Sequence, residues 1–346
     1  MIPHFRPSID DGDIDAVVQT LRGKHLSDGV AVEALERALS ARFDDAEVVA
    51  VSSGTAALYL ALAALGVARG STVVIPSYTC ASLYAAVAHI GAAPVCADSH
   101  HRGICITPAT VAAVNGTGTG SAAAVIAPYC CGFACDVAGM RSAGRFVIED
   151  CAHTFWGMPG AGLLGLSGDV AVLSFFATKL APAGEGGACV TRERALAERI
   201  RAWRNCDERP LHPHAFNFKM TDLCAALARR RVEQMESEMA ERAALADEYD
   251  RAFTGAAVRL AAEQPQVVPF RYLVDAPGAV DAFIAAAAAA GITCRRPVFK
   301  PLHCALGGDC PRAAQLHDRI VSVPMYPGLS KAERRHILER LPPLLK

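Results

Sequence analysis

The alternation of apolar segments along the chain constrains its fold most strongly. From about residue 10 to residue 235, short runs rich in β-branched residues alternate with longer stretches of helical periodicity. This alternation is typical of strands joined by crossover helices in a mostly parallel sheet. We expect seven strands, at EVVAVS, TVVIPS, APVCAD, AAAVIAP, RFVIED, DVAVLSFF and GACVT. Because most of these runs have no polar face, helices should cover both sides of the sheet.

A second, smaller unit is expected in the C-terminal part of the chain. At 346 residues the chain exceeds the size at which a single core usually stops growing. We expect a large domain over residues 1–235 and a small α+β domain over residues 236–346. The charged helical segment 220–253 should link them. Strand candidates at QVVPFRYLVD and RIVSVPMYPGLS flank an alanine-rich helix, AVDAFIAAAAAAG.

Charge and hydropathy exclude several classes of partner. The 34 basic and 35 acidic side chains nearly balance, which argues against a dedicated nucleic-acid surface. The longest apolar run, residues 56–68, is too short to cross a bilayer and suits a buried helix. The segment MIPHFRPSIDDGD lacks the pattern of a signal peptide, so we expect a cytoplasmic protein with no membrane partner.

The cysteines are expected to be reduced thiols without a metal. There are 13 of them, with no CxxC pair and no regular spacing. Small buried hydrophobic residues are the favoured interpretation. His303, Cys304 and Cys310 form only a weak ligand set, so we predict no metal site.

The first expected strand ends in a polar segment that leads into a helix. Ser53, Gly54 and Thr55 precede the apolar run 56–68. Free N–H groups at a helix N-terminus, with these hydroxyls, can hold a phosphate. An ordinary N-cap explains the same residues equally well.

Two other strand ends carry a carboxylate and a lysine. Asp150 ends the strand RFVIED, Ser174 lies in the strand DVAVLSFF, and Lys179 follows that strand. Alone, Asp150 reads equally well as a capping residue, and Lys179 as a solvated lysine. Together, a phosphate cradle, a carboxylate and a lysine at three strand ends are what pyridoxal 5′-phosphate (PLP) requires from a protein.

In these motifs the sequence resembles the DegT/DnrJ/EryC1/StrS family of PLP-dependent aminotransferases. The resemblance extends over nearly the whole chain, through LRGKHLSDG, SSGTAAL, IEDCAH, SFFATKLAPAGEGG, FNFKMTDLCAAL, PLH and SVPMYPGLS. It implies a fold type I aminotransferase, with the seven-stranded sheet and a smaller C-terminal domain. It also implies that an amino donor, glutamate or glutamine, passes its nitrogen to a keto sugar, typically one linked to a nucleotide.

The resemblance assigns roles to individual residues. Lys179 corresponds to the lysine that forms the Schiff base, and Asp150 to the partner of the pyridine nitrogen. Ser174, Gly54 and Thr55 correspond to phosphate ligands.

Two further residues correspond to positions around the cofactor. His153 stands where relatives have Gln or His near the phenolic oxygen of PLP, although a strand-end histidine without a role is also plausible. Asn217 matches an asparagine that reaches the phosphate of the neighbouring subunit. The resemblance therefore implies a homodimer with shared active sites.

One position departs from the family pattern at the cofactor itself. Relatives usually have an aromatic residue that stacks on the pyridine ring where this chain has Cys80. We expect weaker retention of PLP, or replacement of the stacking residue by Tyr78. Cys80 is also the feature that favours a non-catalytic, regulatory PLP-fold protein over an enzyme.

The sequence does not decide the identity of the amino-group acceptor. Lys179 favours transamination over the dehydratase-like relatives that carry histidine there, and a cyclitol or a free keto sugar is the alternative to a nucleotide-linked one. Basic groups could hold a diphosphate, or could simply form a solvated loop. These groups are Arg295, Arg296, Lys300 and His303.

Overall fold

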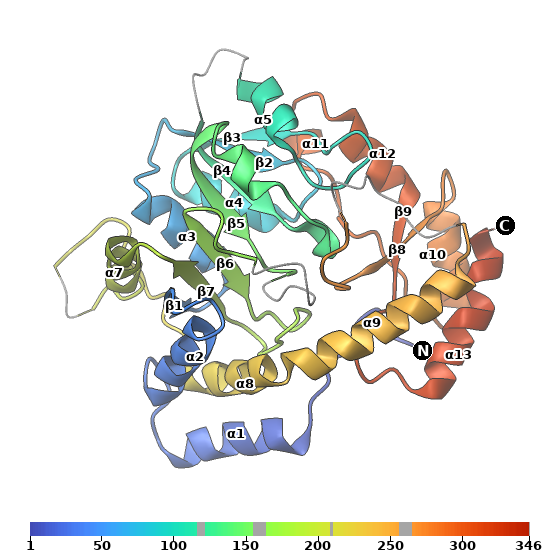
Figure 1. Cartoon of the computed structure of the whole chain (residues 1–346), viewed down its shortest axis with the longest axis horizontal. Helices are drawn as coiled ribbons and strands as arrows, with labels where there is room; N and C mark the ends of the chain where they lie inside the picture. Colours follow the sequence, from blue (N-terminus) through green and yellow to red (C-terminus); the bar gives the residue numbers. More distant parts are fainter. Residues whose placement is uncertain (116–121, 155–163, 208–209, 256–264, 346) are drawn as a thin grey trace.

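A seven-stranded sheet lies at the centre of the molecule (Figure 1), in the order β1-β7-β6-β5-β4-β2-β3. The computed structural model describes residues 1–115, 122–154, 164–207, 210–255 and 265–345. The strands are β1 (Glu47–Val51), β2 (Thr72–Pro76), β3 (Ala93–Ala97), β4 (Ala122–Pro128), β5 (Gly144–Asp150), β6 (Val170–Ser174) and β7 (Gly187–Thr191). The prediction of seven strands in a mostly parallel sheet is confirmed.

One strand of the sheet runs against the others. Strands β2 to β6 pair in parallel, whereas β7 is antiparallel to both of its neighbours, β6 and β1. Strand β1 is therefore parallel to β6, and the carboxyl ends of β1, β5 and β6 lie at the same edge. In open α/β sheets this edge is where ligands bind.

Helices cover both faces of the sheet, as the strands without a polar face predict. One face packs against α3 (Gly54–Ala64), α4 (Ala81–His89) and α7 (Arg194–Trp203). The other packs against α2 (Val30–Ser40), α5 (Pro108–Asn115), α6 (Val137–Met140) and α8 (Asp222–Glu233). Helix α1 (Asp11–Arg22) lies outside α8 (Figure 1).

Helix α3 explains the longest apolar run of the sequence. Its residues 56–64 are all buried, and the hydroxyl of Ser53 caps the helix by accepting a hydrogen bond from the N–H of Ala56 at 3.0 Å. A helix that is apolar on every side is stable only inside a core. No helix among the described residues is long and apolar enough to cross a membrane.

The C-terminal unit is built on a two-stranded antiparallel sheet, β8 (Tyr272–Asp275) and β9 (Ile320–Val323). Around it lie α9 (Met235–Ala252), α10 (Val280–Ala289) and α13 (Lys331–Arg340), whereas α11 (His303–Leu306) and α12 (Pro311–Arg319) pack against the core of the large sheet. Two short 3₁₀ helices, η1 (Cys130–Gly132) and η2 (Pro342–Leu345), complete the elements.

Two expected elements differ in extent. The strand expected over residues 266–275 is regular only in β8, because Pro269 cannot donate to a ladder. Before it, the N–H groups of Val267 and Val268 donate instead to the carbonyl of Gly132. The expected linking helix is two helices, α8 and α9, because the backbone leaves helical geometry at Gln234 (φ −91°, ψ 0°).

The first residues of the chain pack with the C-terminal unit. Ile2 pairs with Ile292 in a β-bridge and shares an apolar cluster with Leu245 and Tyr249. The N-terminal segment thus crosses over to the smaller unit. The division into domains at residues 1–235 and 236–346 remains a proposal. This crossing places His4 beside the sheet edge described next.

Candidate active site

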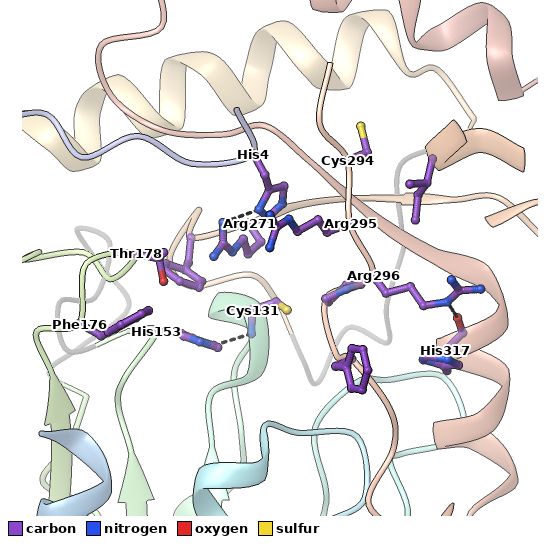
Figure 2. A pocket seen from close by; sticks show the side chains of 14 residues that line it. His4, Cys131, His153, Phe176, Thr178, Arg271, Cys294, Arg295, Arg296 and His317 are labelled. Carbon is purple, nitrogen blue, oxygen red and sulfur yellow. Dashed lines mark hydrogen bonds between the residues drawn. The ribbon is translucent and has the colours of Figure 1, made fainter. Parts of the chain in front are cut away.

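A cavity of about 640 Å³ opens between the C-terminal unit and the carboxyl edge of the sheet. Figure 2 shows His153, Phe176 and Thr178 on one side of it, and Arg296 and His317 on the other. The remaining lining residues are His4, Cys131, Phe270, Arg271, Ile284, Cys294, Arg295, Pro297 and Phe299.

The start of α3 and the end of β6 form a tight concave corner. A Cβ atom added to Gly54 would lie 3.0 Å from Cβ and 3.2 Å from Oγ of Ser174. The hydroxyl of Ser53 accepts a hydrogen bond from the N–H of Ala56. The two preceding N–H groups at the start of the helix, on Gly54 and Thr55, have no acceptor among the described residues. The corner thus offers backbone and hydroxyl donors to an anion the size of a phosphate.

Gly187, the first residue of β7, keeps this corner in place. A Cβ atom there would lie 2.5 Å from the carbonyl carbon of Ser53 and 2.6 Å from the nitrogen of Gly54. Such contacts are shorter than a real Cβ tolerates, so any side chain would push the start of α3 away from Ser174.

We predict that Gly187→Ala weakens the affinity for PLP by about tenfold and lowers the Tm, because overpacking costs about 1–3 kcal/mol. Absorbance titration with PLP and thermal unfolding measure the two effects. Gly23→Ala is the matched control, since the nearest atom to its new Cβ is an ordinary 3.4 Å away and its φ is −69°. Equal PLP affinity in Gly187→Ala and wild type would contradict the assignment of this corner to phosphate.

Two adjacent carboxylates at the end of β5 have different surroundings. Glu149 accepts hydrogen bonds from the N–H groups of Gly165, Ser167 and Gly168 and from the hydroxyl of Tyr129. Asp150, on the other face of the strand, accepts one described bond, 3.0 Å from the N–H of Ala152. Burial raises the pKa of Asp150, and the nearby Lys179 opposes this shift. Glu149 is therefore a structural residue, whereas Asp150 has acceptor capacity to spare.

Lys179 is held by a short hairpin between β6 and β7. Its N–H donates to the carbonyl of Phe176 at 2.8 Å, and Ala177 donates to Gly184, whose φ of +81° favours glycine. Burial lowers the pKa of Lys179, which Cys80 and Asp150 partly offset. Lowering the pKa increases the fraction of the amine that is neutral and able to act as a nucleophile or base.

His153 faces the cavity in a fixed orientation. Its Nδ1 accepts a hydrogen bond from the N–H of Cys131 at 3.2 Å, and its ring stacks on Phe270 at 4.2 Å between centroids. Burial, with Lys179 and Arg271 nearby, holds the pKa of His153 well below its usual range. The ring is therefore neutral, and Nε2 carries its proton as a donor.

The remaining predicted residues lie around this site but not on the cavity wall. Cys80 is exposed at the N-cap of α4, whereas Tyr78 is fully buried, with no hydrogen-bond partner for its hydroxyl among the described atoms. Asn217 is exposed on the surface, next to Phe216, whose exposed fraction is 64%. Neither Lys300 nor His303 lines the cavity. Lys300 is exposed, and Nδ1 of His303 lies 2.6 Å from Oγ of Ser77.

Sequence reasoning missed His4, Phe270 and Arg271, although all three line the cavity. An arginine inside an apolar strand candidate was the available signal for Arg271. His4 had none, because only the tertiary fold brings the N-terminus to this edge. Among the residues described, no group of three or more His, Cys, Asp or Glu side chains is placed to hold a metal ion.

Comparison with known proteins places the chain among aminotransferases. The model of the DegT/DnrJ/EryC1/StrS aminotransferase family matches residues 7–342. The spore coat polysaccharide biosynthesis protein SpsC of Bacillus subtilis is 31% identical over 73% of this chain and 69% of that protein. The GDP-perosamine synthase of Escherichia coli O157:H7 is 28% identical over 72% of this chain and 71% of its own length. In fold, the aminotransferase TlmJ from Streptoalloteichus hindustanus matches with a TM-score of 0.91 at 24% identity, covering 100% of this chain and 99% of that one.

Proposed function

The chain belongs to the DegT/DnrJ/EryC1/StrS aminotransferase family, and we propose that it uses PLP to move an amino group from glutamate or glutamine to a nucleotide-linked keto sugar. The observation that carries this proposal is the convergence of Asp150, Ser174 and Lys179 at one sheet edge, beside a cavity lined by His153. The electrostatic influence of Asp150 and Lys179 on each other's pKa supports their proximity.

The donor groups of this edge suit PLP. The corner formed by Ser53, Gly54, Thr55 and Ser174 would hold the phosphate. Asp150, with its spare acceptor capacity, would bind the protonated pyridine nitrogen. When bound there, PLP supplies an electron sink for the bond broken at the α-carbon of the donor.

The chain's own residues then handle protons and orientation. The neutral amine of Lys179 can accept the proton from the α-carbon of the donor and later return one to the carbon that receives nitrogen. The Nε2–H of His153 can donate to an oxygen in the cavity, because Nδ1 is occupied by Cys131. The stacking of His153 on Phe270 fixes the direction of that donor.

A homodimer with shared sites is part of the proposal. Asn217 is exposed and directly follows Phe216, whose exposed fraction is 64%; Leu211, six residues before Asn217, is 99% exposed. Exposed apolar side chains of this size are typical of interaction surfaces. If Asn217 serves the partner's site, inactive Asn217→Ala and Lys179→Ala chains should regain activity when mixed, because each heterodimer contains one intact site. Absence of any recovery in proven heterodimers would assign Asn217 to its own subunit.

The nucleotide-linked acceptor is supported by the name of the GDP-perosamine synthase relative and by the basic cavity. The test is a panel of nucleotide-linked keto sugars, free keto sugars and keto cyclitols, with glutamate or glutamine, scored by amine formation. Amination of a nucleotide-linked sugar at the lowest concentration is the expected result. Preference for a cyclitol or a free keto sugar would make that compound class the acceptor in place of the nucleotide-linked sugar. If no compound of the panel is aminated, a non-catalytic PLP-fold protein is favoured.

A cytoplasmic location with reduced thiols belongs to the same proposal. None of the 13 cysteines forms a disulfide, and nine of them, Cys130 and Cys151 among them, are buried, as is typical of small thiol side chains in intracellular proteins.

We expect Cys80→Phe to tighten PLP binding by about three- to tenfold, because an aromatic ring over the cofactor adds about 0.5–1.5 kcal/mol of stacking. The extended backbone at Cys80 (φ −76°, ψ 157°) accepts phenylalanine without strain. Absorbance titration with PLP measures the change, and Cys304→Phe, at another exposed cysteine, is the control. Unchanged affinity in Cys80→Phe would show that this position does not face the ring.

A further inference from the structure

Two arginines and a histidine gather on one wall of the cavity. Figure 2 shows His4, Arg271 and Arg295 together, with His153 below them in this view. They come from distant parts of the chain: the N-terminal segment, the residue before β8, and a segment that pairs with β9 through a bridge to Ser322.

His4 is the neutral member of this group. Its Nδ1 lies 3.5 Å from a guanidinium nitrogen of Arg271, and its Nε2 lies 3.0 Å from Oγ of Ser322. Since arginine only donates, Nδ1 is the acceptor and Nε2 carries the proton. Burial, together with Arg271 and Arg295, holds the pKa of His4 at about 3, so the ring adds no charge of its own.

Arg271 is oriented by aromatic rings rather than by a carboxylate. Its guanidinium carbon lies 4.7 Å from the ring centre of Phe270 and 6.0 Å from that of Phe5. Stacking fixes the plane of a guanidinium and leaves its N–H edge available for ligands. Burial lowers the pKa of Arg271, and Arg295 lowers it further.

The cationic charge of Arg271 and Arg295 is not neutralised by the described part of the chain. No carboxylate within the described ranges forms an ion pair with either one. Arg296, which lines the same cavity, is bound by Asp281 at 2.5 Å. Two guanidinium groups that are close together and face a cavity cost electrostatic free energy, which a bound anion would recover.

We propose that Arg271 and Arg295, with the neutral His4 beside Arg271, form a subsite that binds an anionic oxygen group of a substrate. Carboxylates and phosphoryl groups share the planar or forked oxygen pattern that guanidinium recognises. This inference rests on the proposed function, which supplies two sources of such a group. They are the carboxylate of the amino donor and the phosphoryl group of the acceptor.

Calorimetric titration of the PLP-loaded protein tests the subsite. The probes are glutarate, which stands in for the donor, and inorganic pyrophosphate, which stands in for the acceptor; loading with PLP keeps the phosphate corner occupied. We expect Arg271→Gln to weaken binding of at least one probe by about tenfold or more, and Arg295→Gln by about threefold or more. Arg296→Gln removes the same charge from the same cavity, but we expect less than a twofold change because Asp281 already neutralises it.

The two probes separate the sources. A loss confined to glutarate assigns the subsite to the donor, a loss confined to pyrophosphate assigns it to the acceptor, and a loss with both means that the two substrates use it in turn. If neither probe binds the wild type at millimolar concentration, or if Arg296→Gln weakens binding as much as Arg271→Gln, the proposal is overturned.

Further controls distinguish loss of the subsite from misfolding and from failure of the proposed function. Arg271→Lys keeps the charge and should retain part of the binding, and circular dichroism verifies that each variant is folded. The PLP absorbance band reports the cofactor independently. A protein with that band but unaltered binding in Arg271→Gln would refute the subsite alone, whereas a protein without the band would refute the proposed function.

Discussion

Replacing Lys179 with alanine is expected to lower kcat by at least about a thousandfold, because in the proposed mechanism this residue both attaches the cofactor and moves the proton. The reason lies in its placement on the short hairpin between β6 and β7, where burial lowers the pKa of the amine. Lys179 is buried and adjoins the cavity wall through Thr178, whereas Lys300, which adjoins it through Phe299, is exposed. Single-turnover amine formation measures the effect.

The location of the attached cofactor gives a second readout for the same variant. Borohydride reduction of wild-type protein with PLP should leave the added mass on the peptide that contains Lys179, and Lys179→Ala should show none. Lys331→Ala, at an exposed lysine that begins α13, is the control and should retain wild-type turnover. Full turnover in Lys179→Ala, or labelling of another lysine, would exclude the proposed chemistry.

Replacing Asp150 with asparagine is expected to lower kcat by about a hundredfold or more, while raising the Tm of the cofactor-free protein by about 2 °C. Activity falls because a neutral amide cannot stabilise a protonated pyridine nitrogen. Stability rises because burial raises the pKa of Asp150, so the native state binds a proton more tightly than the unfolded chain. The stability of the cofactor-free protein therefore falls as pH rises through the window between the unfolded and native pKa values, and asparagine removes this loss.

Glu149→Gln is the matched control for that substitution. Glu149 is also buried at the end of β5, but its carboxylate accepts bonds from Tyr129 and from three backbone N–H groups. We expect its replacement to lower the Tm, since hydrogen bonds to a charged group contribute about 1.5–3 kcal/mol each. Thermal unfolding at pH 7 compares the two variants. A lower Tm in cofactor-free Asp150→Asn, or undiminished turnover, would contradict the role given to Asp150.

The parts of the fold that depend on local pattern could be predicted from the sequence. The seven strands appear at the expected apolar runs, and the run over residues 56–68 forms the buried helix α3. The strand-end positions of Asp150 and Lys179 followed from the same pattern, because parallel strands share one carboxyl edge.

Features that depend on contacts between distant residues could not be predicted. The break between α8 and α9 falls at Gln234, whose side chain donates to Asp10 from the other end of the chain. His4 and Arg271 meet on the cavity wall although they are far apart in the sequence, and no local sequence pattern predicts this contact. The opposite roles of Glu149 and Asp150 depend on which face of β5 each side chain meets, and that required the structure.

The most direct test of the proposed chemistry is the visible absorbance spectrum of the purified protein with PLP, recorded before and after glutamate is added. We predict a yellow band that forms with wild type, is absent in Lys179→Ala, and bleaches when glutamate transfers its amino group. A wild-type protein that stays colourless with PLP, or whose band is unchanged by glutamate and glutamine, would contradict the assignment of this site to transamination.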